Sequence, residues 1–300
     1  MFGVTILGNN SALPAYNRHP TAQVVTLSDH QFLVDCGEGT QMQMNLYKIR
    51  RSRINHIFIS HLHGDHYFGL PGLITSYGLM NRPHDLHLYG PKPLQEILDL
   101  QLSVSATKLP YTLHFHALEE ETSTLVNEEH FVVESFRVLH RIDCWGFLFR
   151  EKRKPRKINP EAVTANKIPI EFYERLKEGE NFITNDRIIP NDLLTIANKP
   201  SKTYAYSADT IYDESLVEKV QNVNLLYHEA TYLRDKADKA ASRFHSTSEQ
   251  AAMLAKLANV QKLLIGHFSS TYESLDEFLS EAKIIFENTQ LALEGQTFIV

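Results

Sequence analysis

The stretch that decides the fold runs from Ile54 to His66 and reads Ile-Asn-His-Ile-Phe-Ile-Ser-His-Leu-His-Gly-Asp-His. Its first six residues, 54–59, form a short apolar run that predicts a buried strand. Side chains two apart in an extended chain point the same way, so His61 and His63 can bind one ion. Gly64 allows a sharp turn that brings Asp65 and His66 to face the same space. Three imidazoles and a carboxylate at the end of a strand suit Zn²⁺ or a similar ion.

Composition limits the class of protein. Hydrophobic residues make up 43% and charged residues 22% of the 300 residues, which is ordinary for a globular protein. The formal net charge of −6 argues against indiscriminate nucleic-acid binding, and we expect no DNA partner. The two cysteines, Cys36 and Cys144, form no Cys-x-x-Cys motif, which fits a reducing cytoplasm. No apolar run approaches the ~20 residues of a membrane span. We therefore expect a soluble cytoplasmic protein without a signal peptide or a membrane partner.

Polar residues that could bind metal or do chemistry recur at the ends of other predicted strands. They are Asp35, His140, Asp209, His228, Glu229 and His267. Sites in α/β folds collect at strand ends, where loops meet over a packed core. Five histidines and two aspartates among these positions and the histidine motif suffice for two metal ions with positions left for water. That composition points to hydrolysis by a metal-activated hydroxide.

Several other segments carry specific expectations. Residues 21–27 and 31–34 predict a β-hairpin, and residues 192–197 and 203–206 predict a strand pair. A helix through Met42, Leu46 and Ile49 is expected to end in the basic Arg50–Arg53 run, which the helix dipole would explain. Ser246 with Glu249 predicts a capping box. The run 150–157 has six basic residues and one acid, and taken alone the segment 150–190 indicates a solvated loop.

The chain resembles the ribonuclease Z family of the metallo-β-lactamase superfamily almost from end to end. The superfamily motif His-x-His-x-Asp-His is present as His61–His66, and Phe32–Gln41 resembles the family's first motif. Ser60–Leu73 resembles its second motif. The segment Tyr227–Thr231, followed by His245-Ser-Thr247, resembles the signature that separates these ribonucleases from other superfamily members. The resemblance implies an α/β metallo-β-lactamase fold, a four-layer αββα sandwich with a protruding arm.

The resemblance also implies residue roles. One zinc ion would be held by His61, His63 and His140, and a second by Asp65, His66 and His267, with Asp209 bridging them. Two Zn²⁺ are expected for each subunit, although Mn²⁺ or another divalent ion is possible. Asp65 would accept the proton of the attacking water, and His245, hydrogen-bonded to Glu229, would protonate the leaving 3′ oxygen of the tRNA. Asp35 would orient a ligand imidazole from outside the coordination shell.

The implied activity is that of a zinc-dependent endoribonuclease that removes the 3′ trailer from precursor tRNA. It would leave a 3′-hydroxyl on the tRNA and a 5′-phosphate on the trailer. The resemblance implies a homodimer and a single domain over residues 1–300, in which about 150–190 form an inserted flexible arm that binds tRNA. On this basis we prefer an arm to the solvated loop.

Two alternatives remain. The first is a hydrolase of small esters or phosphodiesters with the same fold, which would need neither the arm nor the Glu229–His245 pair. The second is a nucleic-acid-binding protein without catalysis, for which seven metal-competent residues would have no purpose. Three segments depart from the family's usual text, and in the arm Ile168–Lys177 replaces a Gly-Pro-rich sequence. Ser207-Ala-Asp-Thr210 has Ala before the aspartate where the family usually has Gly, and Arg-Ile-Asp follows His140.

Overall fold

The computed structural model describes residues 1–184 and 186–300. The chain divides into two compact units. The first contains Met1–Asn127, Val133–Phe149 and Thr203–Val300, and the second contains Glu128–Val132 and Arg150–Lys202. In the described ranges, no helix has both the length and the apolar character that crossing a membrane would require.

The first unit contains a seven-stranded sheet in which β5 leads directly into the His61–His66 motif. Strands β3 and β4 pair antiparallel, as the predicted hairpin requires, whereas β4, β5, β6 and β7 pair in parallel. Strand β5, the predicted strand before the histidines, lies within this parallel part. The order is β20 (Thr297–Ile299), β1 (Phe2–Gly8), β3 (Ala22–Leu27), β4 (His30–Val34), β5 (Ile54–Phe58), β6 (Leu86–Pro91) and β7 (Leu113–Leu118).

A second seven-stranded sheet carries the remaining candidate residues. Its strands β15, β16, β17 and β19 pair in parallel. The order is β19 (Thr289–Leu291), β17 (Lys262–Gly266), β16 (Leu225–Glu229), β15 (Thr203–Tyr206), β10 (Cys144–Glu151), β9 (Phe131–Val138) and β8 (Thr122–Asn127). Strands β8 and β10 were absent from the sequence-based expectation. Near the end of the chain, residues 289–299 form two short strands, β19 and β20, one in each sheet.

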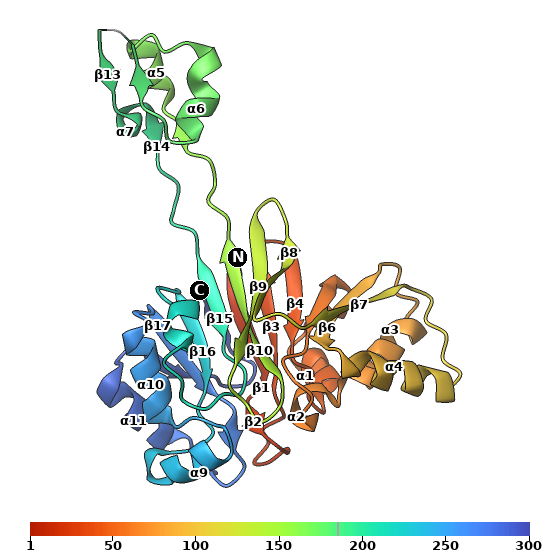
Figure 1. Cartoon of the computed structure of the whole chain (residues 1–300). Coiled ribbons are helices and arrows are strands. Elements are labelled where there is room, and N and C mark those ends of the chain that lie inside the picture. Colours follow the sequence, from red (N-terminus) through yellow and green to blue (C-terminus); the bar gives the residue numbers. More distant parts are fainter. Residues whose placement is uncertain (185) are drawn as a thin grey trace. The chain divides into compact units, whose positions relative to one another are not determined.

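The two sheets pack face to face through aromatic side chains. The ring centroids of Phe58 and Phe147 lie 5.3 Å apart, and those of Phe32 and Phe149 lie 5.5 Å apart. Helices α1 (Thr40–Leu46), α3 (Leu70–Leu79) and α4 (Pro93–Val104) cover the first sheet through a fully apolar core. Helices α10 (Ser248–Leu257) and α11 (Asp276–Ile285) pack on β16, β17 and β19. The first unit is therefore the predicted four-layer αββα sandwich (Figure 1).

Two predicted helix ends are wrong. Helix α1 ends at Leu46, and Arg51–Arg53 form a separate 3₁₀ turn, η1, before β5. The helix dipole therefore does not explain the basic Arg50–Arg53 run. Helix α10 is capped by Thr247, whose hydroxyl accepts from the Gln250 amide at 3.2 Å, so the capping box lies one residue later than predicted.

The second unit is a small folded body with its own core, so the solvated-loop interpretation of this segment is wrong. Its core side chains are Val163, Ile168, Leu176, Phe182, Ile189 and Leu194. Residues 191–194 are helical, and β14 (Thr195–Ile196) pairs with β11 (Lys157–Ile158). The predicted pairing of 192–197 with 203–206 is therefore also wrong. The other elements are α5 (Pro160–Ala165), η2 (Ile170–Phe172), α6 (Tyr173–Lys177), β12 (Phe182–Ile183), β13 (Ile188–Ile189) and α7 (Asn191–Leu194).

The remaining short elements of the first unit connect the sheets to the candidate site. Strands β2 (Asn10–Ser11) and β18 (Phe268–Ser269) pair in parallel. Helix α2 (Gly64–Tyr67) begins within the histidine motif. The others are α8 (Leu216–Lys219), η3 (Arg234–Lys236) and α9 (Ala237–Ser242).

Candidate metal centre and active site

The seven residues expected to bind metal lie together at the ends of strands from both sheets. The first sheet places His61, His63, Asp65 and His66 after β5. The second places His140 after β9, Asp209 after β15 and His267 after β17. Their ligand atoms fall into two groups, and within each group all the atoms lie within 4.8 Å of one another. The first group is His61, His63, His140 and Asp209, and the second is Asp65, His66 and His267.

The first group is built on the Nδ1 atom of His63. This atom lies 3.0 Å from Nε2 of His61 and 3.1 Å from Nε2 of His140. Two atoms bound to one ion at about 2.0–2.1 Å in tetrahedral geometry lie about 3.3 Å apart. Because the three nitrogens match that spacing, they fit a shared ion.

The second group is arranged around a carboxylate oxygen. Oδ2 of Asp209 lies 3.3 Å from Nε2 of both His66 and His267, and 3.6 Å from Nε2 of His61. Oδ2 of Asp65 lies 3.4 Å from Nε2 of His267. Asp209 thus reaches imidazoles of both groups, as a bridging carboxylate must. Nitrogen and oxygen donors in this mixture fit Zn²⁺ and related divalent ions.

The other ring nitrogen of each imidazole is held by a hydrogen bond. Nδ1 of His140 donates to the carbonyl of Phe244 at 2.8 Å, and Nδ1 of His267 lies 2.8 Å from the Thr231 hydroxyl. Nδ1 of His66 donates to Oδ2 of Asp35 at 2.8 Å. Such contacts fix the ring orientation and the tautomer of a metal-binding histidine.

Asp35 is fully buried and lies where the two sheets meet. Its carboxylate accepts hydrogen bonds from the Ser60 amide at 2.7 Å, the Ser60 hydroxyl at 2.9 Å and the Tyr206 hydroxyl at 2.6 Å. It also accepts the His66 bond. Asp35 therefore contacts an imidazole of the group from outside it, which is the place that the family resemblance implies.

The electrostatics of the metal-free groups follow from burial and from their neighbours. Burial opposes ionisation of Asp65, but the His66 and His267 imidazoles outweigh burial and lower the pKa of this carboxyl. The same imidazoles lower the pKa of Asp209 against its complete burial. Burial and the adjacent His140 lower the pKa of His63 to about 4. The aspartates are thus ionised and His63 is neutral near pH 7, which are the forms that bind cations.

Glu229 and His245 form the predicted pair next to these groups. Oε1 of the fully buried Glu229 accepts a hydrogen bond from Nδ1 of His245 at 2.8 Å. Oε2 accepts from the amide and the hydroxyl of Thr231. Burial opposes protonation of His245, but the Glu229 carboxylate outweighs burial and raises the pKa of His245 to about 9. His245 also approaches Asp209 and His267 closely enough to form a third potential group.

A cleft of about 390 Å³ lies over the metal-binding residues. Asp65, Asp209, His245 and His267 line it, and so do side chains that were absent from the sequence-based expectation. These are Phe68, Arg141, Tyr232 and Arg243. One signal in the sequence could have found the arginines, because Arg141 follows His140 directly and Arg243 lies two residues before His245.

His228 also lies at a predicted strand end, but it does not line the cleft. His228 is fully buried, and its Nδ1 donates to the Glu229 carbonyl at 2.7 Å. Its burial lowers its pKa. His228 is therefore a neutral core histidine outside the groups that could hold metal.

Comparison with known proteins first defines the class. Residues 2–154 match the family model described as anti-Pycsar protein Apyc1, a span that contains His61–His66 but not Asp209 or His267. The whole structure resembles the metallo-β-lactamase fold protein YhfI from Bacillus subtilis, with a TM-score of 0.71, 19% identity and coverage of 99% of both chains. The chain therefore has the metallo-β-lactamase fold.

Closer relatives define the family. The chain is 43% identical to ribonuclease Z of Bacteroides thetaiotaomicron, over 100% of this chain and 95% of the relative. It is 42% identical to ribonuclease Z of Parabacteroides distasonis, over 100% and 99%. The structure of human tRNase Z, short form (ELAC1), matches with a TM-score of 0.73 and 27% identity, over 99% of this chain and 98% of that one. The chain belongs to the ribonuclease Z family, which confirms the family and the enzyme class predicted from its motifs.

The Asp35 network generates a prediction about metal affinity. Asp35→Asn keeps a residue that tolerates the left-handed backbone, where φ is 56°, but replaces an ionised acceptor by an amide. Because the bond to His66 weakens, metal affinity should fall by about 10–100-fold. Competition with a chromophoric chelator measures this affinity. The control is Asp29→Asn in the exposed β3–β4 turn, and equal affinities in the two variants would contradict the role of Asp35.

Proposed function

We propose that this chain is a zinc-dependent endoribonuclease that removes the 3′ trailer from precursor tRNA. The products would be a tRNA with a 3′-hydroxyl and a trailer with a 5′-phosphate. The observation that carries the proposal is the Glu229–His245 pair beside the two groups of metal-competent residues. Its RNA substrate is supported by full-length relatives named ribonuclease Z and by the neighbour named tRNase Z.

We assign two zinc ions to the two groups. His61, His63 and His140 would hold one ion, Asp65, His66 and His267 the other, and Asp209 would reach both. Bound there, such ions would offer positive charge to the phosphoryl oxygens and would lower the pKa of water, so that hydroxide is available to attack at neutral pH. Mn²⁺ or another divalent ion would also suit these donors.

The chain's own side chains would move the protons. Asp65 has an ionised carboxylate whose Oδ2 accepts from the Ala12 amide at 2.7 Å, so it is positioned to accept a proton from the attacking water. His245 is held protonated by Glu229 and lines the cleft. It can therefore donate a proton to the departing 3′ oxygen of the tRNA.

Two arginines would bind the flanking phosphates. Arg141 and Arg243 line the cleft, and neither forms a salt bridge among the described residues. Nη2 of Arg141 lies 3.0 Å from Nε2 of His63, which places its guanidinium beside the first group. Guanidinium groups bind phosphate with bidentate geometry, so these side chains suit an RNA backbone on either side of the cut.

The second unit would bind tRNA as an arm of about residues 150–190. A basic pocket of about 290 Å³ lies in this unit, and Arg153, Lys154 and Lys199 line it without an acidic residue. Lysine and arginine contacts to phosphates give affinity that depends on salt but not on sequence. The rest of the chain would form the catalytic domain.

We further propose a homodimer in the cytoplasm. Exposed apolar side chains on α1 and α3, Met42, Leu46 and Leu79, would be covered by a second copy. The two cysteines are buried and free, which suits a reducing compartment. Light scattering should give twice the chain mass of 34.4 kDa, and a mass of one chain would contradict the dimer.

The activity is tested with a precursor tRNA that carries a 3′ trailer. Asp65→Ala should abolish cleavage because the proton acceptor and one metal-binding oxygen are lost. It should leave tRNA binding largely intact, because the phosphate contacts remain. Gel analysis of product ends and filter binding measure the two quantities. Full cleavage by this variant, or cleavage products without a 3′-hydroxyl on the tRNA, would count against the mechanism; Asp29→Ala serves as the control.

The proton-donor role of His245 predicts a dependence on the leaving group. His245→Ala should slow precursor cleavage by about 10²–10⁴-fold, because an alkoxide leaving group needs a proton. Hydrolysis of bis(p-nitrophenyl) phosphate should fall much less, because p-nitrophenolate leaves without one. Glu229→Gln should show the same pattern more weakly. An equal loss on both substrates would argue for a role of His245 in metal binding instead.

The arm is tested by shortening it at its own base. The Glu151 amide donates to the Lys202 carbonyl at 2.9 Å, so a short Gly-Gly link can replace 152–201, which removes the basic pocket as well. The shortened protein should bind precursor tRNA more weakly yet hydrolyse bis(p-nitrophenyl) phosphate at the original rate. Its matched variant, Arg153→Gln with Lys154→Gln, keeps the fold and removes only charge. Unchanged tRNA affinity in both proteins would refute the arm assignment.

A further inference from the structure

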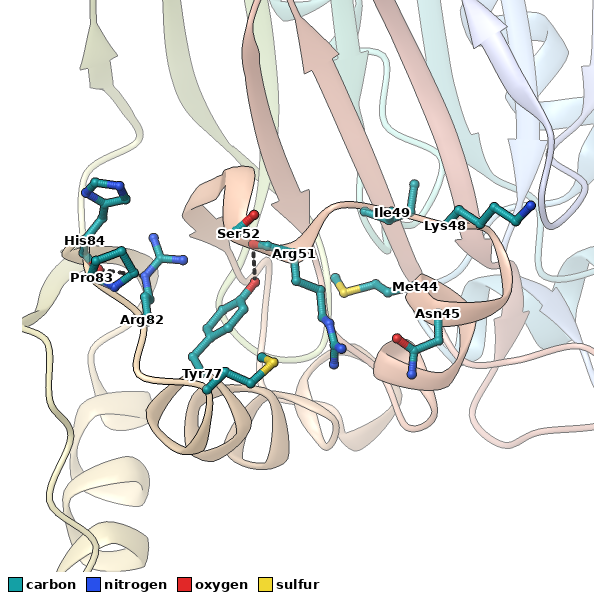
Figure 2. Close-up of a pocket in the computed structure, with 11 residues that line it drawn as sticks. Met44, Asn45, Lys48, Ile49, Arg51, Ser52, Tyr77, Arg82, Pro83 and His84 are labelled. Atoms are coloured by element: carbon teal, nitrogen blue, oxygen red, sulfur yellow. Dashed lines mark hydrogen bonds between the residues drawn. The ribbon is translucent and has the colours of Figure 1, made fainter.

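A second pocket lies in the first unit, away from the cleft over the metal-binding residues. It is formed by α1, the η1 turn, the end of α3 and the segment that follows α3 (Figure 2). Its volume is about 560 Å³, and it shares no lining residue with the cleft. That volume lies within the range of about 300–1,000 Å³ that is usual for small-ligand sites.

The pocket is lined by cations and by no acid. Lys48, Arg51 and Arg82 contribute charged side chains, and none of the other lining residues is Asp or Glu. Within residues 1–184 and 186–300, none of the three cations lies within 4.0 Å of a carboxylate oxygen. The nearby Asp85 carboxylate accepts instead from Nε2 of His114 at 2.8 Å. The pocket therefore concentrates positive charge in a chain whose net charge is −6.

Arg82 is the most buried of the three cations that line this pocket. Its side chain is 94% buried, since only 6% is exposed, and neutral oxygens hold its guanidinium. Nε donates to the His84 carbonyl at 2.7 Å, and Nη2 donates to Oδ1 of Asn55 at 2.6 Å. Nη1 is buried without a hydrogen-bond partner, and the guanidinium lies 5.0 Å from the ring centre of Tyr77. Burial disfavours this charge more than nearby groups such as Asp85 favour it, and an anion in the pocket would offset that cost.

Arg51, one of the three arginines of the basic Arg50–Arg53 run, lines this pocket. These cations do not end a helix, because α1 stops at Leu46 and Lys48 has a left-handed φ of 56°. That backbone conformation is unfavourable for a lysine, and here it places Lys48 on the rim, whereas η1 places Arg51 inside the lining (Figure 2). Lys48 and Arg51 therefore line the same pocket as the buried Arg82, from the opposite side of Tyr77 (Figure 2).

We infer that this pocket binds a phosphate group. Three cations give charge-assisted hydrogen bonds, and the Asn45 amide and the Ser52 hydroxyl add neutral donors at the rim. The phosphate could belong to the backbone of an RNA or to a free phosphate compound such as a nucleotide. The chemistry of recognition is the same in both cases, and the site takes no part in the cleavage reaction.

The test uses the full-length, metal-loaded protein and the double variant Lys48→Gln/Arg51→Gln. Both side chains lie at the surface of the pocket, so the variant should fold, whereas a change at Arg82 would disturb the core. The matched control, Lys256→Gln/Lys283→Gln, removes the same charge from exposed positions on α10 and α11. Calorimetric titration with inorganic phosphate and with AMP measures small ligands, and filter binding over a salt series measures precursor tRNA.

If free phosphate compounds are the ligand, the double variant should lose one phosphate-binding site per chain and keep its tRNA affinity. If RNA is the ligand, its tRNA affinity should fall by about tenfold at low salt, and its salt slope should fall by about 1.5. Binding equal to that of the control in both assays would overturn the inference. So would loss of the dimer mass, because the cations would then serve the contact between subunits.

Hydrolysis of bis(p-nitrophenyl) phosphate should stay unchanged in the double variant, since the metal-binding residues are untouched. This measurement separates the inference from the proposed function. A wild-type protein that fails to cleave precursor tRNA but binds phosphate in the pocket would contradict only the proposed nuclease. A nuclease whose double variant behaves like the control would contradict only the pocket.

Discussion

The site depends on one buried carboxylate. Asp35 follows β4 of the first sheet, and it accepts hydrogen bonds from Ser60, His66 and Tyr206. Ser60 and His66 follow β5 of the same sheet, whereas Tyr206 ends β15 of the other sheet. The Asp35 side chain therefore orients the His66 imidazole, holds the loop that follows β5 and links the two sheets through Tyr206. A neutral or shorter side chain would leave buried donors unpaired, which costs about 1–3 kcal/mol for each group.

A second buried carboxylate, that of Glu229, orients His245 in a similar way. Glu229 is fully buried, and four hydrogen bonds hold its carboxylate in one position. A buried carboxylate is stable only when it is paired or fully hydrogen-bonded, and His245 supplies that pair. Burial alone would lower the pKa of His245, but the Glu229 carboxylate raises it, so His245 stays protonated. The pair thus keeps an acid ready beside residues that are arranged to attract a divalent cation. Separate environments for the two roles allow acid and base to work at one pH.

Local patterns predicted the residues that the structure gathers into two metal-competent groups, because each follows an apolar run that is long enough to be recognised as a strand. Strand β10 was missed because Cys144–Phe149 is buried on both faces and lacks alternation. Gly146, which weakens a strand prediction, is needed there because a Cβ would lie 2.3 Å from the Phe136 ring. The second unit was missed as a folded body because its helices and strands are too short to show a period. Arg141 and Arg243 enter the cleft only through tertiary structure, and the shift of the cap arises because the Ser246 hydroxyl donates to the distant Thr210 carbonyl.

The order of the metal-binding residues along the chain has a consequence for synthesis. His61 lies in the first quarter of the sequence, whereas Asp209 and His267 come from the last third. A nascent chain therefore cannot complete the second group of ligands until His267, in its last third, has left the ribosome. The centre forms only when the two sheets have docked, so a truncated or half-folded chain cannot act on the RNA around it. Hydrolysis can therefore begin only after the polypeptide is nearly complete.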